Sequence, residues 1–592
     1  MGAAEAQSGR IPDDRVEWAR IERVAHAAVA ATDPRTMLAL EQHGLGLATI
    51  LEAPGDSTRA MMRTEKYRAL VEVLDADLRE LGDRPTVGGD DAPNHAFKAS
   101  WLRSSRTRFE LVGVVNRLDR RFAEPGTCGE VRLVYRLALT PAGRPVTRLP
   151  MTINLHFPQH GDCGAIARRW LGVAPGGTER VAGLLERVRE ASPVARVEVD
   201  VQNLHGPALR IGEDDHAEYL LRTFETKGQT LVPRLLVNTP RPDLSLAERA
   251  DLAAWIVQHF AEVDEGTAVL PDRFLATRAI SVTPRGLARP RNRVFRSLFE
   301  QDATATRTFD ALPFAGAKVV GSTRALLRRL DEGTCNGCHQ SRAVAGFHLL
   351  GEERDPDVAF NALAVGRSPH FLEELGWREA FVRSVAGEGE SPPRPFAGHA
   401  RNGVYGAHCG LGDAGFAGFT CGAHLRCRDT DGDELGTCVS DDGNQVGDAC
   451  ENARIVFADT PDGDRILPGK KEGCDMRGAH QTADACSPNA YGFAGGLCSE
   501  ECATLGVVEG AAICTDIPTS GYESECFLTP QPIEQCLLTH VARRWVRTCD
   551  AENPCRDDYG CARVSGAPAG IGACVPPYFV FQARVDGPAL DR

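Results

Sequence analysis

Residues 131–139 read Val131-Arg132-Leu133-Val134-Tyr135-Arg136-Leu137-Ala138-Leu139, and an apolar side chain recurs at every second position. Successive side chains of a β-strand point to opposite faces, so this period predicts a strand with one face in a core. The alternation recurs in two further segments, Met151-Thr152-Ile153-Asn154-Leu155-His156-Phe157 and Val197-Glu198-Val199-Asp200-Val201. Strands of this kind predict a sheet that helices must cover on its apolar side.

Apolar residues at helical spacing predict those helices. The predicted helices cover residues 14–31, 67–81, 165–171 and 179–190. Ser245 and Glu248 have the spacing of a capping box, which predicts the start of a further helix. Lys227-Gly228 is the expected turn of a hairpin between residues 218–224 and 231–237. We therefore assign residues 1–290 to an α+β domain with a mostly antiparallel sheet.

The pentapeptide Cys335-Asn336-Gly337-Cys338-His339 has the spacing that attaches haem c covalently. Two thiols three positions apart can each form a thioether with one vinyl group, and the adjacent His339 reaches the iron as proximal ligand. We expect Gly337 to let the backbone turn closely against the porphyrin edge. The motif therefore predicts haem c bound through Cys335, Cys338 and His339.

Helix signals stand on both sides of this motif. Ser322 caps a predicted helix over residues 322–330, and Ser368-Pro369 begins a second helix after the motif. We expect these two helices to pack on each other and to shield the haem. Residues 291–400 are therefore predicted to form a mainly helical, cytochrome c-like segment, which the Pro-rich string at residues 391–395 separates from the tail.

Three other interpretations of the two cysteines stay open. Cys335 and Cys338 can be joined in a disulfide, or they can form a redox dithiol, although no βαβ context supports the second idea. A zinc site is the third interpretation, with His348 as one further ligand, but the chain has no second CxxC pair.

The sixth ligand of the haem iron is not defined by the motif. No methionine occurs between Met151 and Met476, so methionine ligation is not expected. His348 is the candidate distal ligand, and His370, His399 and His408 also follow the motif as alternatives. An open distal side would instead favour a peroxidase-like or gas-binding role.

Cysteine usage divides the chain. Sixteen of the 20 cysteines lie between Cys409 and Cys574, which predicts a disulfide-rich, loop-rich domain over residues 401–592. Outside the tail and the motif only Cys128 and Cys163 remain, an even pair that predicts one bridge. This usage indicates an oxidising compartment, so we expect the protein in the periplasm, at the cell surface or secreted. No signal peptide is visible at Met1–Asp13, and we expect the export signal to lie outside this sequence.

Charge and hydropathy limit the kinds of molecule that this protein is expected to bind. Residues 409–592 hold 28 acidic and 14 basic side chains, which accounts for the whole formal net charge of -14. Without a basic stripe, nucleic acid is not an expected partner. No run of about eighteen apolar residues is present, so no membrane span is expected, although association with the cell surface stays open.

Calcium is a possible second cofactor, at a string of alternating carboxylates in the tail, Asp429-Thr430-Asp431-Gly432-Asp433. The string lacks the remaining pieces of an EF-hand, and it resembles the Asp-rich repeats of thrombospondin type 3. Candidate calcium ligands are therefore Asp429, Asp431 and Asp433, beside the simpler interpretation that Asp-Gly pairs form turns.

The body of the chain carries no recognisable catalytic string. It has no Gly-rich phosphate loop, no His-Glu-x-x-His and no Gly-x-Ser-x-Gly. An enzyme whose site is built from scattered residues is compatible with this pattern, so whether the protein is an enzyme stays open.

Three strings together carry a family resemblance: residues 115–119 (Val-Asn-Arg-Leu-Asp), residues 128–132 (Cys-Gly-Glu-Val-Arg) and residues 334–339 (Thr-Cys-Asn-Gly-Cys-His). They resemble those of large, functionally uncharacterised bacterial exported proteins that end in a cysteine-rich tail. The resemblance implies a location outside the cytoplasm and a haem, and it implies no reaction.

The function that these patterns favour is an extracytoplasmic monohaem c-type protein that transfers electrons to an unidentified redox partner. A different class is an extracellular adhesion or binding protein whose motif cysteines are structural. The third is a haem enzyme of peroxidase type with an open distal side.

Overall fold

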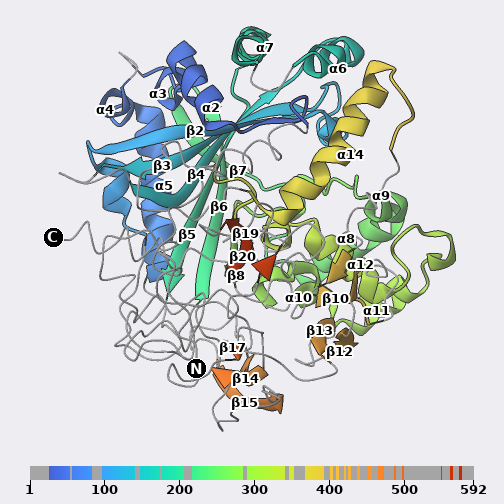
Figure 1. Cartoon of the computed structure of the whole chain (residues 1–592). Coiled ribbons are helices and arrows are strands. Elements are labelled where there is room, and N and C mark those ends of the chain that lie inside the picture. The colour runs from blue at the N-terminus through green and yellow to red at the C-terminus, as the bar shows by residue number, and fades with distance from the viewer. Residues whose placement is uncertain are drawn as a thin grey trace, which may run out of the picture.

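A computed structural model describes residues 26–392 with short gaps at 54–56, 83–96, 141–146, 174–176, 192, 206–215, 284–289, 340–345 and 352–366. Beyond residue 392 it describes only short segments, the last of which ends at Val575. Figure 1 shows the described body as a long twisted sheet with helices around it.

The sheet has eight strands, and every neighbouring pair in it is antiparallel. Its strands are β1 (Ala30–Ala31), β2 (Thr107–Arg117), β3 (Glu130–Leu139), β4 (Thr147–Pro158), β5 (Arg196–His205), β6 (His216–Lys227), β7 (Thr230–Arg234) and β8 (Arg278–Thr283). They follow in chain order from β1 to β7, and β8 pairs with β6 beside β7. The predicted strands and the hairpin at Lys227-Gly228 are confirmed, and the α+β class with them.

Strand register separates an apolar face of the sheet from a polar one. Leu133 lies opposite Leu155, while the next pair along the same strands is Arg132 and His156. Side chains directly opposite each other share a face, so the alternation seen in the sequence gives one apolar and one polar surface. The polar surface is also buried: His156 and Asp200 are each 1 % exposed. A polar sheet face that is shielded from bulk water needs internal partners or a cavity.

Helices from the first half of the chain cover the apolar face and form the larger core with it. They are α2 (Pro34–Leu40), α3 (Leu47–Ile50), α4 (Thr58–Met61), α5 (Glu65–Gly82), α6 (Cys163–Leu171) and α7 (Thr178–Ala191). A turn, η1 (Glu41–Leu45), follows α2. Tyr135 in β3 is fully buried there, and its hydroxyl donates to the carbonyl of Leu45 at 2.7 Å.

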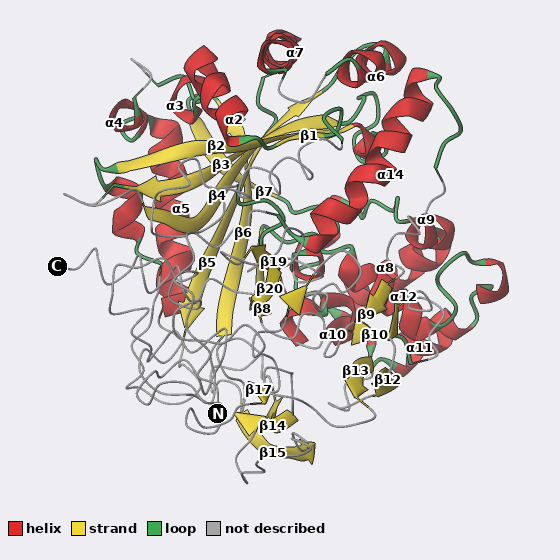
Figure 2. Cartoon of the chain, in the orientation of Figure 1, coloured by secondary structure: helices red, strands yellow, loops and turns green. Residues whose placement is uncertain are grey.

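A second core is built from helices on the other side of the polar face (Figure 2). These helices are α8 (Leu246–Gln258), α9 (Phe260–Glu265), α10 (Val294–Phe299), α11 (Ala303–Asp310) and α12 (Thr323–Glu332). The single turn α13 (Cys335–Cys338) follows α12. Short 3-10 turns are η2 (Ala99–Arg103), η3 (Leu118–Arg120), η4 (Asp272–Phe274), η6 (Pro290–Asn292) and η7 (Phe314–Gly316). This core joins residues from both sides of the boundary predicted at residue 290.

The last helix of the body, α14 (Pro369–Ala386), packs against α6 and the larger core, as Figure 1 shows. Its Phe371 and Val382 belong to that core, whereas Leu326 and Leu330 of α12 belong to the second. The expectation that these two helices pack on each other is therefore wrong, because their apolar faces have different partners. A cytochrome c-like helical unit is not confirmed by these contacts.

The other predicted helices can be compared with the helices of the structure. The predicted helices at 67–81, 165–171, 179–190 and 322–330 and the Ser245–Glu248 capping box are confirmed. The predicted helix at 14–31 is wrong for residues 26–31, and its earlier part lies outside the described residues. Ala30 and Ala31 pair with Val115 and Val114, because the edge of β2 offers backbone partners to this segment.

The predicted bridge between Cys128 and Cys163 is confirmed. In the tail, a bridge joins Cys409 to Cys427, and seven of the other fourteen tail cysteines lie outside the described residues. The described tail strands are β9 (Arg401–Gly403), β10 (His408–Cys409), β11 (Phe419–Cys421), β12 (Leu425–Arg428), β13 (Gly436–Ser440), β14 (Glu451–Val456), β15 (Arg465–Glu472), β16 (Cys486–Ser487), β17 (Leu497–Cys498), β18 (Thr548–Cys549), β19 (Gly560–Arg563) and β20 (Gly572–Val575).

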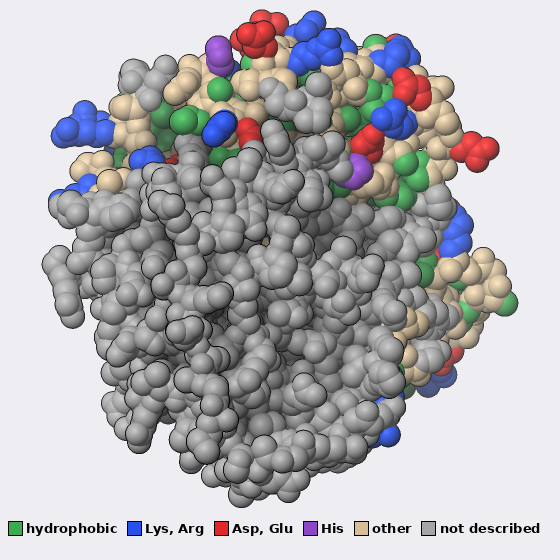
Figure 3. Space-filling view, viewed as in Figure 1, with side chains coloured by type: hydrophobic (Ala, Val, Ile, Leu, Met, Phe, Trp, Pro, Cys, Tyr) green, Lys and Arg blue, Asp and Glu red, His purple; other side chains and the backbone are tan. Residues whose placement is uncertain are grey.

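On the described part of the face in Figure 3, basic and acidic side chains are interspersed. Among the residues that the structure describes, no helix combines the length and the apolar character needed to cross a membrane.

Candidate functional site

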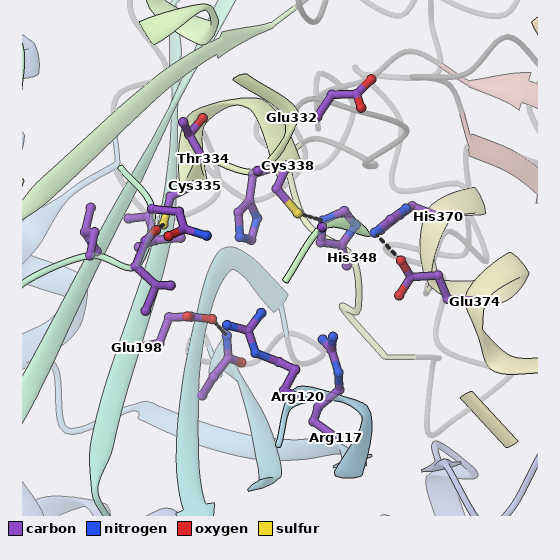
Figure 4. A pocket seen from close by; sticks show the side chains of 18 of the residues that line it. Arg117, Arg120, Glu198, Glu332, Thr334, Cys335, Cys338, His348, His370 and Glu374 are labelled. Atoms are coloured by element: carbon purple, nitrogen blue, oxygen red, sulfur yellow. Dashed lines mark hydrogen bonds and ion pairs between the residues drawn. The ribbon is translucent and has the colours of Figure 1, made fainter. Parts of the chain in front are cut away.

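A cavity of about 420 Å³ lies between the polar face of the sheet, the α12–α13 corner and α14. This volume falls within the usual range of cofactor and ligand sites. Cys335, Cys338, His339, His348 and His370 all line it. Figure 4 shows Arg117 and Arg120 pointing into the space below Cys338 and His348, with Glu198 on the side of Cys335.

The turn that carries the motif is fixed by hydrogen bonds at its first residues. Thr334 Oγ1 donates to the carbonyl of Asp331 at 2.6 Å and accepts the N–H of Gly337 at 2.9 Å, so Thr334 caps α13. Asn336 donates to the carbonyl oxygens of Ile280 and Arg291 at 2.7 and 3.1 Å. The motif is thereby held against β8 and η6 rather than on a free loop.

Gly337 is required by the close contact between α13 and the end of α12. A Cβ at this position would overlap the carbonyl oxygen of Asp331 and crowd Glu332. Glycine therefore allows α13 to fold back onto the end of α12. The expected approach of the backbone at Gly337 to a porphyrin edge stays a prediction.

The two motif cysteines are free thiols in the structure and line the cavity. Burial raises the pKa of Cys335 to about 12 and that of Cys338 to about 11. Both are therefore protonated at neutral pH. Cys338 Sγ lies 3.7 Å from His348 Nε2, whereas Cys335 Sγ faces the carbonyl of Val237 at 3.8 Å. The disulfide between them, one of the open interpretations, is not formed here.

His339 is held in one orientation. Its Nδ1 lies 2.9 Å from the carbonyl oxygen of Gly346, and its ring stacks on Tyr219 with centroids 4.9 Å apart. A carbonyl can only accept, so Nδ1 carries the proton and Nε2 keeps its lone pair. Burial lowers the pKa of His339, which keeps the ring neutral. Gly346, at φ 86°, touches the Tyr219 ring where a Cβ would not fit.

His348 lies beside His339 instead of facing it across a gap. The two ring centroids are 5.0 Å apart. Two axial histidines of one haem would each direct a ring nitrogen at the iron from opposite sides, with the macrocycle between the two rings. The arrangement described here therefore leaves no space for a porphyrin between His339 and His348, and distal ligation by His348 stays a prediction.

His370 completes a cluster that sequence reasoning did not assemble. The ligand atoms of Cys338, His348 and His370 all lie within 4.8 Å of one another. His370 Nε2 is also 3.2 Å from Glu374 Oε1, one helical turn further along α14. The spacing of His370 and Glu374 was a signal available in the sequence, because residues four apart share a helix face.

Opposite the motif, the cavity has a wall of paired charges. Arg117 binds Asp119 through two bonds of 2.9 and 3.1 Å. Arg132 and His156 both contact Glu130, at 2.6 and 3.2 Å. Burial and the neighbouring guanidinium groups of Arg132 and Arg117 lower the pKa of Arg120 to about 10. This lowering indicates that positive charge is crowded in this part of the wall.

Two carboxyl groups of β5, those of Glu198 and Asp200, lie on the same wall, and their pKa values shift in opposite directions. Burial and the charge of Glu198 raise the pKa of Asp200 well above its usual value. Burial alone would also raise the pKa of Glu198, but His156 and Arg132 outweigh it and lower the pKa. Asp200 therefore holds its proton more strongly than Glu198 does. Sequence reasoning missed this pair, whose only signal was the polar half of the alternating strands.

The remaining predicted site residues are not brought to this cavity by the described part of the chain. Asp429, Asp431 and Asp433 lie outside the described residues, as does His399. His408 lies in β10 and pairs with Thr437.

Comparisons with known proteins identify neither a family nor a fold relative for this chain. No protein-family model, curated protein or solved structure matches this chain.

Proposed function

We propose that this protein binds one haem c covalently at Cys335 and Cys338 and uses it to transfer electrons outside the cytoplasm. The observation that carries this proposal is the joint placement of two free thiols and His339 on one wall of the 420 Å³ cavity. A bound haem c supplies one-electron redox chemistry at its iron.

The thiols fit their proposed role chemically. Each S–H adds across the C=C bond of one vinyl group: sulfur bonds to one carbon, hydrogen goes to the other, and nothing leaves. The addition therefore needs no oxidant. Both sulfurs are unbonded and face the cavity, which is the state that this addition requires.

His339 fits the role of proximal ligand. A metal-binding histidine usually donates its second ring N–H to a carbonyl or carboxylate, which fixes the ring and makes the ligating nitrogen more basic. His339 makes this bond through Nδ1 to Gly346, at 2.9 Å. Its Nε2 is then the nitrogen offered to iron.

The charged wall suits the acidic edge of the cofactor. Haem carries its two propionates on the edge away from its two vinyl groups, and Arg117 and Arg120 point into the space below Cys338. Guanidinium groups bind carboxylates through charge-assisted hydrogen bonds. An anion beside Arg120 would also relieve the crowding of positive charge that lowers its pKa.

The wider proposal keeps the sequence-based expectations that the structure leaves untested. It includes export, a cytochrome c-like role for residues 291–400, an unidentified redox partner, and calcium at the acidic tail. Asn154 donates to both Glu198 and Asp200, each at 2.8 Å, so the two carboxyl groups lie close together, and their pKa values shift in opposite directions. This pair favours a second candidate, a peroxidase-like enzyme, because two carboxyl groups of unlike proton affinity can move a proton.

The test is a denaturing gel stained for haem, with an absorption spectrum, on protein exported by a host with haem c maturation machinery. We expect a stained band, its loss in Cys335→Ala with Cys338→Ala, and an altered spectrum in His339→Ala. Arg121→Gln, an exposed neighbour of Arg120 outside the cavity lining, is the control and should stain normally.

A colourless wild-type protein from that host would overturn the haem proposal and leave the structural interpretation of the motif. If the band is present, binding of carbon monoxide to the reduced protein separates the two haem functions. Rapid binding favours the open, peroxidase-like site, and its absence favours electron transfer.

A further inference from the structure

We infer that Cys338, His348 and His370 bind one divalent transition metal, best represented by Zn²⁺, in protein that carries no haem. This site goes beyond the proposed function because it uses the Cys338 sulfur as a thiolate. Attachment of haem would convert that sulfur to a thioether, so the two occupants exclude each other at Cys338.

The three side chains have the right atoms at the right separation. Tetrahedral zinc with bonds of about 2.3 Å to sulfur and 2.0–2.1 Å to nitrogen places its ligand atoms roughly 3.5 Å apart. Cys338 Sγ and His348 Nε2 are 3.7 Å apart, and all three ligand atoms fall within 4.8 Å. Small side-chain rotations are sufficient to close such a site.

Residues of helix α14 and its N-cap contact the ring nitrogens of His348 and His370 and so fix the orientation of both rings. Ser368, its buried N-cap, has Oγ 3.0 Å from Nδ1 of His348, which leaves Nε2 facing Cys338. Glu374 Oε1 lies 3.2 Å from Nε2 of His370, and the same carboxylate pairs with the guanidinium of Arg378. Partners of this kind around ligating histidines typically change metal affinity by about 10–100-fold when they are removed.

The donor set selects the class of metal. One thiolate and two imidazoles suit zinc and its neighbours, whereas calcium and magnesium prefer oxygen ligands. All three side chains also line the cavity, so a fourth position is within reach of water or a small ligand. Three protein ligands with an accessible fourth position are typical of catalytic rather than structural zinc.

The experiment is a titration of the full chain with Co²⁺, made in a host without haem c maturation machinery and stripped with a chelator. Cobalt reports its ligands through visible absorption and a thiolate charge-transfer band. We expect one Co²⁺ per chain with a thiolate band, displacement by Zn²⁺, and at least tenfold weaker binding in His370→Gln and His348→Gln. The thiolate band should disappear in Cys338→Ala.

Matched variants separate this site from the haem proposal. Cys335→Ala and His339→Gln remove residues that haem needs and the metal does not, so both should keep the cobalt band. His370→Gln should keep covalent haem when the maturation machinery is present, because neither thioether nor His339 is changed.

Two results would overturn the metal site. One is the absence of a cobalt thiolate band in the wild-type protein, and the other is an unchanged band in Cys338→Ala, which would place the sulfur ligands in the cysteine-rich tail. Neither result changes the interpretation of the haem stain, because that stain tests covalent haem in protein made with the maturation machinery. A protein that binds cobalt but never takes up haem would support the metal site and refute the haem proposal.

Discussion

Gly337 shows how one absent side chain positions both motif thiols. The turn α13 folds back so closely onto α12 that the Asp331 carbonyl occupies the place of a Cβ. Relief of that overlap requires backbone movement, because the opposing atom is not part of a flexible side chain. The residues on either side of Gly337 are Asn336, which ties the turn to β8, and Cys338, which faces the cavity.

We therefore predict that Gly337→Ala lowers the free energy of unfolding by about 1–3 kcal/mol, as overpacking of a close contact does. Gly316→Ala is the control, since nothing lies within 4 Å of a Cβ at that position. Thermal denaturation of both variants and the wild type measures the effect. Equal melting of Gly337→Ala and the wild type would show that the α12–α13 contact has little energetic weight.

Asp331 gives a second prediction at the scale of a single residue. Its Oδ1 accepts the N–H of Phe295 at 2.6 Å at the start of α10, and burial raises its pKa to about 8. The folded state therefore keeps a proton that the unfolded chain loses above about pH 4. By linkage, the free energy of unfolding falls as pH rises from about 4 to about 8 and then levels off.

Asp331→Asn removes this dependence and keeps an acceptor for Phe295. The variant should gain stability over the wild type on the order of a few kcal/mol at pH 8 and much less at pH 4.5. Melting temperatures at the two pH values measure the difference, with exposed Asp251→Asn in α8 as the control. The same difference at both pH values would mean that Asp331 is ionised in the folded protein.

At the scale of elements, periodicity predicted strands and helices well, because each depends on which residues within about ten positions face a core. The cavity depends on register and packing instead. Arg132 and Glu198 lie on different strands, and Arg378 comes to the same cavity from α14. A strand whose polar face meets water has the same alternating sequence as a strand whose polar face lines a cavity. The charged wall could therefore not be predicted from the sequence.

The motif itself illustrates the same limit. Its spacing predicted which residues bear the chemistry, but not their neighbours. His348 was the candidate distal ligand, whereas the partnership of His370 with Cys338 follows from the packing of α14 on the larger core. The two helices that flank the motif were predicted correctly as helices and incorrectly as packing partners. An apolar helix face shows that the helix is buried, but not which element it packs against.

At the scale of the whole molecule, the bridge between Cys128 and Cys163 joins parts of the fold that frame the cavity. Cys128 stands just before β3, and Cys163 begins α6, on which α14 packs. Helix α14 in turn carries Ser368, His370 and Glu374. A covalent link at this point therefore supports the helix that orients the metal-binding cluster, although it lies outside the cavity lining.

We predict that Cys128→Ala with Cys163→Ala lowers the free energy of unfolding of the body by about 3–4 kcal/mol. The estimate follows from the chain entropy of a loop closed across 35 residues. Both thiols are removed together, so that neither is left to pair with a tail cysteine. Denaturant titration in a Trp545→Phe background, followed by the fluorescence of buried Trp170 in α6 and the other tryptophans outside the tail, measures the loss, because the tail then contributes no tryptophan signal. Wild-type protein produced in a reducing cytoplasm should unfold at the same denaturant concentration as this variant, since the bridge does not form there. A variant that unfolds at the midpoint of the oxidised wild type would show that packing alone holds α6 on the sheet, and the bridge could then no longer be used as an argument for export.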